Sequence, residues 1–403
     1  MPETNGELRR IFLDKVHLKG YKSIEDLTID FQKGLNILIG KNGSGKTNLM
    51  EFLFQVTGHN RSNKPLYNYS KVDLVSDDDH SFILELEKII QTKADKQDID
   101  ERVKKREKII VDKTVIFDYS IDKYNTVQFE FKNSNLQFFQ FRSSLRTLFD
   151  NLGYYYIYPL FIRFDLPVNL ACISTSGSVK INLEEQQFGT WETPETLSFI
   201  SDIFWQLELA YDEVDAIMNM VNTDFHNRLQ SQLKYDILEN LKLYSPIEDI
   251  KFNSNINLYK TEKELIVENI KLEFKINGNW LPWSQLSDGT RRLFYIIAEV
   301  TNTNGLVLIE EPELGIHPHQ FNLLMTFLKE QSEDKQIIIS THAPKALDHL
   351  TQKELNNIIL TYYDSKKGTQ MRHLTSKEVE KAKLYLKDVG FFSDYWLMSD
   401  LEE

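Results

Sequence analysis

Residues 40 to 47 read Gly40-Lys41-Asn42-Gly43-Ser44-Gly45-Lys46-Thr47 and fit the pattern G-x-x-x-x-G-K-[ST] at every position. The almost continuous apolar run of residues 35–39 precedes this stretch, and an amphipathic segment, residues 48–54, follows it. A strand buried on both faces, a glycine loop and a helix in this order predict a loop whose backbone N–H groups bind phosphate oxygens. The alternative, an ordinary glycine turn, requires neither the strand nor the helix.

The loop also predicts which residues contact a nucleotide and its metal ion. Lys46 would reach the β- and γ-phosphates, and Thr47 would bind Mg²⁺ through its hydroxyl group. The positive N-terminal end of the following helix would face the same phosphates. From this stretch we predict that ATP is bound by Gly40, Asn42, Gly43, Gly45, Lys46, Thr47 and Asn48.

A pair of carboxylates closes a second apolar run. Residues 306–309 are Leu-Val-Leu-Ile, and Glu310, Glu311 and Pro312 follow them directly. Ligands bind at the carboxyl ends of strands in α/β sheets. We therefore predict that Glu310 holds the Mg²⁺ shell and that Glu311 orients and deprotonates the attacking water. The alternative is an acidic pair on an exposed turn, which the apolar strand before it argues against.

A histidine closes a third apolar run. His342 follows residues 336–341, Gln-Ile-Ile-Ile-Ser-Thr, and is the second predicted catalytic residue beside Glu311. Its imidazole would reach a γ-phosphate if this strand lies beside the one that carries Glu310. The alternative is a helix-start residue before Ala343 and Pro344. His317 fits a plain loop residue equally well.

A fourth segment, Leu286-Ser287-Asp288-Gly289-Thr290, precedes an apolar helix. Ser287 can cap that helix, and the amides at the helix N-terminus can bind an anion. One interpretation is a simple helix cap. The other is that Ser287 and Gly289 contact the γ-phosphate of ATP held by a second copy of the chain. Together with the other three segments, this arrangement predicts a homodimer or higher homo-oligomer with a composite ATP site.

Composition limits the class of protein. The chain has 403 residues, with 41% hydrophobic and 27% charged residues, which are typical of a soluble globular protein. The formal net charge of −13 disfavours general coating of nucleic acid, although a local basic stripe such as Lys104–Lys108 stays compatible with it. We read that run as the solvated face of a helix or strand edge. No secretory signal, membrane span or multi-cysteine site is expected, since Cys172 is the single cysteine, so a cytoplasmic protein is predicted.

Alternation and helical spacing along the chain predict an α/β fold. Three strands are expected in residues 11–40, and strand–helix alternation after residue 286 implies a parallel sheet. A charged excursion near residues 90–110 is expected to be helical or poorly ordered. We predict five segments: the N-terminal part of the ATPase core with the phosphate loop (1–60), a β-rich lobe (61–190), a helical lobe (191–250), the C-terminal part of the core (251–350) and a C-terminal extension (351–403).

The four segments, in this order, resemble the ABC-type ATPase heads of the SMC and RecF group. The resemblance is greatest to OLD-like and related RecF-like AAA-family ATPases of bacteria. It is carried by residues 18–24 (Leu-Lys-Gly-Tyr-Lys-Ser-Ile), 286–290 and 310–318. It implies an ABC-type P-loop fold with mixed and parallel sheets, a β-rich N-terminal lobe and a helical insertion. It also implies ATP hydrolysis with Mg²⁺ in a head-to-tail dimer, and a role in antiviral defence that controls a separate effector, a nuclease or toxin.

The chain departs from that pattern at several positions. Asp288 stands where the transporter-type signature has glycine, and Glu310 replaces the commoner aspartate. The glutamine that senses the γ-phosphate is not placed, and Gln137 and Gln140 are the candidates. The long segment between the phosphate loop and residue 286 has no heptad run, so an SMC-type coiled-coil arm is not expected. The metal-binding nuclease domain of OLD nucleases has no counterpart here, so we expect the effector to be another polypeptide.

Three other functions stay open as alternatives. The first is a RecF-like DNA repair or recombination ATPase, which DNA would stimulate. The second is an ABC transporter motor, which the missing Gly-Gly signature and the long middle insertion argue against. The third is a small GTPase, but residues 63–66 (Asn-Lys-Pro-Leu) lack the base-reading aspartate and lie too close to the phosphate loop.

Overall fold

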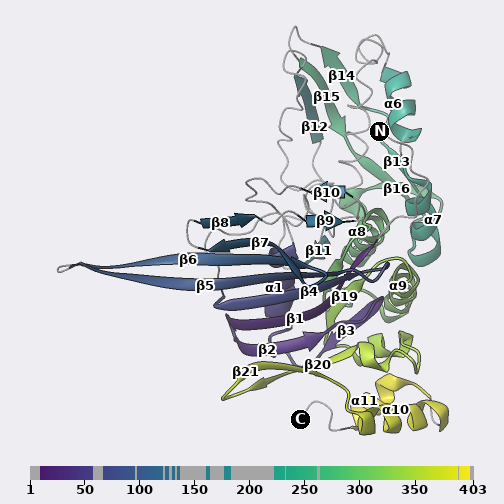
Figure 1. Cartoon of the computed structure of the whole chain (residues 1–403). Coiled ribbons are helices and arrows are strands. Elements are labelled where there is room, and N and C mark those ends of the chain that lie inside the picture. The colour runs from purple at the N-terminus through teal and green to yellow at the C-terminus, as the bar shows by residue number, and fades with distance from the viewer. Residues whose placement is uncertain are drawn as a thin grey trace. The chain divides into compact units, whose positions relative to one another are not determined.

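The computed structural model describes residues 10–57, 67–95, 98–120, 123–126, 129–131, 134–136, 160–163, 177–182, 222–231, 233–260, 264–388 and 390–399. The chain divides into two compact units (Figure 1). Unit 1 comprises Met1–Phe161, Asn304–Pro312 and Leu328–Glu403, and unit 2 comprises Ile162–Thr303 and Glu313–Phe327. Gln137 and Gln140 lie outside the described residues, as does Cys172, so the assignment of either glutamine as the γ-phosphate sensor stays a prediction.

The largest sheet in the described part of the chain has 13 strands. Across the sheet they are β11 (Leu160–Ile162), β18 (Val307–Glu310), β19 (Ile337–Thr341), β3 (Leu35–Ile39), β20 (Ile358–Asp364), β21 (Gly368–His373), β2 (Ile24–Asp30), β1 (Ile11–Tyr21), β4 (Tyr69–Ser76), β5 (Ser81–Asp95), β6 (Asp98–Val111), β7 (Thr114–Ser120) and β8 (Lys123–Thr126). Strands β9 (Phe129–Phe131) and β10 (Ser134–Leu136) form a separate antiparallel pair.

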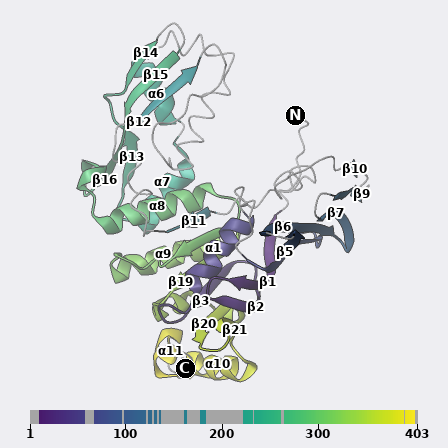
Figure 2. The same cartoon turned by 90° about the vertical axis from the view of Figure 1, so that its left-hand side faces the viewer.

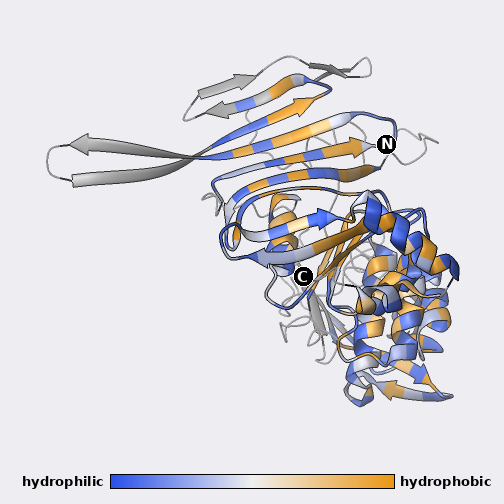
Figure 3. Cartoon of the chain, turned by 90° about the horizontal axis from the view of Figure 1, so that it is seen from below, coloured by the Kyte–Doolittle hydropathy of each residue, from blue (hydrophilic) through white to orange (hydrophobic). Residues whose placement is uncertain are grey.

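Four strands of this sheet, β18, β19, β3 and β20, run parallel to one another. Every residue of β3 and β19 is buried, as expected for strands covered on both faces. The strands from β21 to β8 pair antiparallel, and β4 alternates between partly buried and buried residues. Figure 3 shows this alternation of hydrophilic and hydrophobic positions. The mixed α/β sheet and the three strands predicted in residues 11–40 are confirmed.

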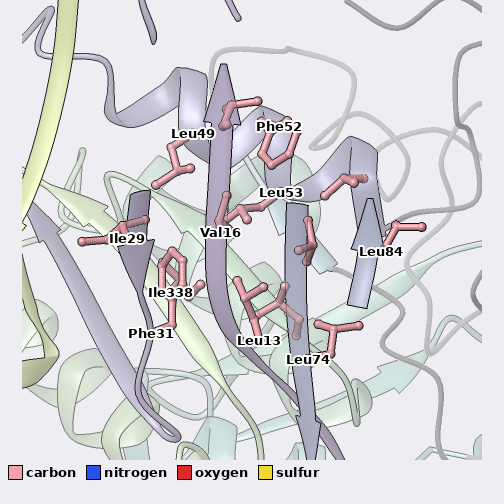
Figure 4. Packing of buried hydrophobic residues seen from close by; sticks show 14 of the residues in the cluster. Leu13, Val16, Ile29, Phe31, Leu49, Phe52, Leu53, Leu74, Leu84 and Ile338 are labelled. Atoms are coloured by element: carbon pink, nitrogen blue, oxygen red, sulfur yellow. The ribbon is translucent and has the colours of Figure 1, made fainter. Parts of the chain in front are cut away.

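Helix α1 (Lys46–Thr57) packs its apolar face into the main core of unit 1. Leu49, Phe52 and Leu53 are fully buried and point toward residues of the sheet, among them Val16 and Ile338 (Figure 4). The helix was predicted over residues 48–54 and extends further in both directions. Because α1 begins immediately after the glycine loop, the packing of its apolar face fixes the position of the loop relative to the sheet.

The charged region near residues 90–110 forms a strand pair rather than the helical or poorly ordered excursion that we predicted. Strands β5 and β6 pair from Phe82 opposite Val111 to Asp95 opposite Asp98, and Figure 1 shows this ribbon extending past the neighbouring strands. Buried Ile109 and Val111 anchor β6 in the sheet, so the charged residues that precede them continue its register. Within the basic run, Arg106 pairs with Asp118 at 3.2 Å and Lys108 with Glu85 at 3.8 Å.

Residues 351–403 contribute to the same sheet through β20 and β21. Short 3₁₀ helices, η3 (Pro344–His349) and η4 (Leu355–Asn357), precede these strands, and α10 (Ser376–Asp388) and α11 (Phe392–Met398) follow them. Helix α11 packs against η3, where Ser393 donates through its backbone N–H and its hydroxyl to the Asp348 carboxylate at 2.8 and 2.9 Å. The five-segment division of the chain stays a prediction.

The described part of unit 2 contains two small antiparallel sheets and several helices (Figure 2). One sheet has the order β12 (Gly177–Asn182), β15 (Glu264–Ile270), β14 (Asn257–Lys260), and the other β13 (Asp249–Phe252), β16 (Leu272–Ile276), β17 (Asn279–Pro282). The described helices of unit 2 are α6 (Asn222–Ser231), α7 (Tyr235–Tyr244), η2 (Trp283–Gln285), α8 (Asp288–Asn302) and the first part of α9 (Pro318–Gln331). Phe294 of α8 forms an aromatic cluster with Phe274 and Trp283, with ring centroids 4.8 to 5.9 Å apart. Among the described residues of both units, no helix combines the length and the apolar character needed to span a membrane.

Candidate nucleotide-binding site

The register of the parallel strands brings three of the four sequence motifs to one edge of the sheet in unit 1. Glu310 of β18 lies opposite Ser340 of β19, and Thr341 of β19 lies opposite Ile39 of β3. Glu311, His342 and Gly40 are the next residues of these three strands. The Glu311 N–H donates to the Ser340 carbonyl at 2.8 Å, which continues the ladder by one residue. The motifs therefore meet at the carboxyl edge, where ligands of α/β sheets bind.

Two positions of the phosphate loop require glycine, because neighbouring residues leave no space for a Cβ atom. A Cβ atom on Gly40 would lie 2.0 Å from the Thr361 carbonyl oxygen, and one on Gly45 would lie 2.0 Å from the Thr369 Oγ1. Gly45 also has a φ of +101°, which side-chain-bearing residues rarely adopt. Gly43, with a φ of +78°, faces open space. The first two glycines allow close packing on β20 and β21, and Gly43 shapes the exposed part of the loop.

Helix α1 begins with Lys46, Thr47 and Asn48, and the side chains of these three residues differ in exposure and in hydrogen-bond partners. The Lys46 ammonium donates to the Gly40 carbonyl at 2.7 Å and to the Lys41 carbonyl at 3.1 Å, and the residue is 6% exposed. Thr47 is exposed at the first turn of the helix. The Asn48 side-chain amide donates to the Ser23 hydroxyl at 2.6 Å. Lysine, exposed hydroxyl and helix N-terminus thus lie together in the loop, as phosphate binding requires.

The two carboxylates differ in backbone conformation. Glu310 ends β18 in the extended conformation of the strand, whereas Glu311 has a φ of +44°. A left-handed backbone is uncommon for a glutamate, costs on the order of 1–3 kcal/mol, and is concentrated at functional sites. Glu311 Oε1 lies 3.6 Å from His342 Nδ1, and both side chains are partly exposed. The turn therefore directs the carboxylate toward the histidine at the mouth of the site.

Hard oxygen donors are available for a magnesium ion. The Thr47 hydroxyl and the Glu310 carboxylate are both in unit 1, on α1 and on the strand β18 against which α1 packs. Mg²⁺ prefers oxygen ligands and retains several waters beside one or two protein groups and nucleotide phosphates. The two protein donors fit this ion, and nucleotide oxygens and waters would complete its shell.

The signature segment lies in unit 2. Ser287 caps α8, and its hydroxyl oxygen accepts from the Thr290 N–H at 3.2 Å. Ser287 is therefore a helix cap, as one of the two interpretations predicted, and its contact with the nucleotide of a second copy stays a prediction. Ser287 itself is exposed. Gly289 is buried, and a Cβ atom at this position would lie only 2.7 Å from the Gly315 carbonyl oxygen, so the close packing requires glycine. Any contact of Gly289 with a nucleotide would have to come from its backbone.

The remaining histidine, His317, belongs to the loop before α9. It is exposed, and its Nδ1 accepts from the His319 N–H at 3.3 Å, which supports the first turn of α9. This contact accords with the loop-residue interpretation of the sequence.

Sequence reasoning did not identify the residues that surround the phosphate loop. Thr361 and Thr369 pack against its glycines, and Ser23 binds Asn48. The only signal was the resemblance of residues 18–24 to a first strand and turn, which assigned no role to Ser23.

Comparison with known proteins identifies the family of the chain and several relatives. Residues 35–348, which include all four motifs, match the model of the family described as AAA domain, putative AbiEii toxin, Type IV TA system. An ATP/GTP phosphatase of Helicobacter pylori is 22% identical over 362 residues, covering 84% of this chain and 88% of that protein. The DNA replication and repair protein RecF of Bacillus cytotoxicus is 43% identical over 44 residues, 11% of this chain and 12% of RecF.

Among solved structures, the chain is similar to SMC head domains. The Smc head domain from Pyrococcus furiosus, solved with an extended coiled coil and bound to the C-terminal domain of ScpA, has a TM-score of 0.47 and 15% sequence identity. That match covers 94% of this chain and 99% of the other. The SMC head domain from Thermotoga maritima has a TM-score of 0.43 at 13% identity, over 90% of this chain and 99% of the other.

The identification as a member of the AAA-family ATPases is confirmed. Because the family model spans well over half of the sequence, the chain belongs to the family described as AAA domain, putative AbiEii toxin, Type IV TA system.

Proposed function

We propose that the protein is an ATP-driven switch that closes head-to-tail with a second copy and reopens on hydrolysis. The observation that carries this proposal is the convergence of Gly40, Glu311 and His342 at one sheet edge, with Glu311 and His342 3.6 Å apart. The phosphate loop would bind ATP in one copy. Ser287, exposed at the N-terminus of α8, would approach its γ-phosphate from the other copy.

The hydrolysis step follows from these groups. Water attacks the γ-phosphorus, its proton passes to the Glu311 carboxylate, and the bond to the ADP oxygen breaks, leaving ADP and phosphate. Lys46 and the loop amides neutralise charge on the phosphates, and His342 polarises the γ-phosphate. Thr47 and Glu310 would hold a Mg²⁺ ion, which would supply further charge neutralisation. Loss of the γ-phosphate would remove the contact of Ser287 with the opposite nucleotide and so release the dimer.

Mixing two inactive variants tests the composite site. Lys46→Ala removes phosphate binding in its own copy, and Ser287→Arg blocks the contact that a copy makes to its partner's nucleotide. A mixed dimer keeps one intact composite site, so an equimolar mixture should recover roughly a quarter of the wild-type ATPase rate. Ser254→Arg, an exposed position of unit 2, is the control and should retain full activity. A mixture no more active than either variant alone would contradict a site shared between copies.

We further propose that the switch controls a separate effector, a nuclease or toxin, in bacterial antiviral defence. The family description names a toxin and a TA system, and the sequence resembles OLD-like ATPases of defence systems. Expression of the chain with the protein encoded next to it in phage-challenged cells tests this role. Protection that Lys46→Ala abolishes is expected, and equal survival with and without the wild-type chain would contradict it.

A RecF-like role on DNA is the second candidate, since one 44-residue segment is 43% identical to RecF. The net charge of −13 provides little of the basic surface that DNA binding needs. An ATPase rate raised severalfold by double-stranded DNA would favour this candidate. A rate that DNA leaves unchanged would favour a protein partner.

A further inference from the structure

The turn between β1 and β2 contacts the phosphate-loop helix at two points. Tyr21 and Ile24 pair across this turn, and Lys22 takes a left-handed backbone with a φ of +50°. Ser23 accepts through its hydroxyl from the Asn48 side-chain amide at 2.6 Å, and Lys22 forms an ion pair with Glu51. Asn48 and Glu51 lie in the first two turns of α1. The turn therefore holds the start of the helix that carries Lys46.

The same serine is joined to the C-terminal strand β21. Its hydroxyl lies 2.7 Å from the Thr369 hydroxyl, and its carbonyl accepts from the Thr369 N–H at 2.8 Å. Gly368 allows this approach, because a Cβ atom there would lie 2.3 Å from the Ser23 carbonyl oxygen. Thr369 is 0% exposed. The two residues are thus fixed to each other through both backbone and side chain.

Thr369 also packs against the phosphate loop at Gly45. Its Oγ1 occupies the place that a Cβ atom of Gly45 would need, at 2.0 Å, and its Cγ2 would lie 2.6 Å from that atom. Gly45 immediately precedes Lys46. The Ser23 and Thr369 hydroxyls therefore contact the loop on both sides of Lys46, Thr369 at Gly45 and Ser23 at Asn48.

We propose that Ser23 and Thr369 are positioning residues for nucleotide binding and act as one hydroxyl pair. The pair sets the direction of the Gly45–Asn48 backbone, so that the loop amides and the Lys46 ammonium converge on the phosphates. Neither residue touches the nucleotide. This inference rests on the proposed nucleotide site and adds to it two residues that are 346 positions apart in the chain.

Removal of either hydroxyl should weaken ATP binding more than it slows turnover. Thr369→Val keeps the side-chain volume and removes the hydroxyl, and Ser23→Ala removes the hydroxyl at a partly exposed position. Each should raise the Kd of a fluorescent ATP analogue, and the KM for ATP, roughly three- to tenfold, the equivalent of one lost hydrogen bond. The kcat should change less than about twofold, because the groups that act on the γ-phosphate remain. The double variant should bind no more weakly than the worse single variant, since residues that act as a unit are not additive.

Two control variants separate positioning from general stability. Thr369→Ser keeps the hydroxyl and should bind ATP like the wild type. Ser332→Ala removes a buried hydroxyl that donates to the Lys329 carbonyl at 2.6 Å, near Gly34 at the opposite end of β3, and should lower the melting temperature without changing the Kd. Unchanged ATP binding in Thr369→Val and Ser23→Ala, with wild-type protein that binds ATP, overturns this inference alone. Wild-type protein that does not bind ATP overturns the proposed function as well.

Discussion

Glu311 shows how a single residue depends on its neighbours in space. Its left-handed backbone, with a φ of +44°, follows a fully extended strand, and its carboxylate lies 3.6 Å from His342. The sequence predicted that both residues end buried strands, because apolar runs are visible locally. It did not predict the left-handed conformation of Glu311, whose N–H donates to the Ser340 carbonyl on the neighbouring strand, because such a contact carries no local signal.

The glycines of the phosphate loop provide a matched pair of substitutions. Gly45→Ala should abolish ATP binding, because the new Cβ atom would lie 2.0 Å from Thr369 and φ is +101°. Gly43→Ala meets no atom within 4 Å and carries only the cost of a left-handed alanine, about 1–2 kcal/mol. Titration with a fluorescent ATP analogue should show no binding for the first variant and weakened binding for the second. Equal affinities would show that contact with Thr369 does not shape the loop.

At the scale of elements, helix α10 begins with a capping box. Thr375 and Glu378 bond reciprocally, with Thr375 N–H donating to the Glu378 carboxylate at 2.6 Å and Glu378 N–H to the Thr375 hydroxyl at 3.3 Å. Arg372 on β21 donates to both oxygens of Glu378 at 2.8 and 3.0 Å. Hydrogen bonds from Arg372 and then from Thr375 lower the pKa of Glu378 from 4.5 to about 2.

This lowered pKa predicts a pH-dependent contribution to folding. The folded-state pKa lies below the unfolded one, so the stabilisation is complete above about pH 4.5 and is lost as the pH falls toward about 2. Because the pair is partly exposed, Glu378→Gln should cost only about 1 kcal/mol of unfolding free energy at neutral pH. Urea unfolding should show the gap between variant and wild type closing as the pH falls through this range. A gap that stays constant with pH would contradict the assignment to the ionised carboxylate.

The packing of α1 gives a second prediction at this scale. Leu53 is fully buried against the sheet, whereas Phe54 on the same helix is 41% exposed. Leu53→Ala should destabilise the protein by about 2–5 kcal/mol, the usual cost of a cavity in a packed core. Phe54→Ala should cost distinctly less, and thermal or urea unfolding compares the two. Similar losses would indicate that the helix face is assigned incorrectly.

Local sequence patterns predicted the individual strands and helices better than they predicted which of these elements lie side by side in the fold. The buried strands β3, β18 and β19 were predicted from their apolar runs, and the helix after the loop from its amphipathic spacing. The position of β19 between β18 and β3 carries no local signal, because order in a sheet is decided by packing and by the crossover helices. The Ser23–Thr369 pair joins residues from the two ends of the chain, so no spacing rule could reveal it. The β5–β6 ribbon was missed because charged residues obscure the alternation of its strands.

At the scale of the whole molecule, the motifs are divided between the units. The phosphate loop, both carboxylates and His342 belong to unit 1, and the signature segment belongs to unit 2. In the proposed head-to-tail dimer, ATP would connect unit 1 of one copy to unit 2 of the next. ATP binding and hydrolysis would then alternate between an associated and a separated state, which we propose that a partner protein detects.

The most direct test is the mass of the Glu311→Gln variant in light scattering at saturating Mg²⁺ and ATP. The substitution keeps the size of the side chain but removes the proton acceptor, so ATP should remain bound and hold the dimer closed. The account predicts a mass twice the 47.4 kDa of one chain, and a return to one chain in the Glu311→Gln, Lys46→Ala double variant. A Glu311→Gln protein that binds ATP and still scatters as a single chain would contradict it.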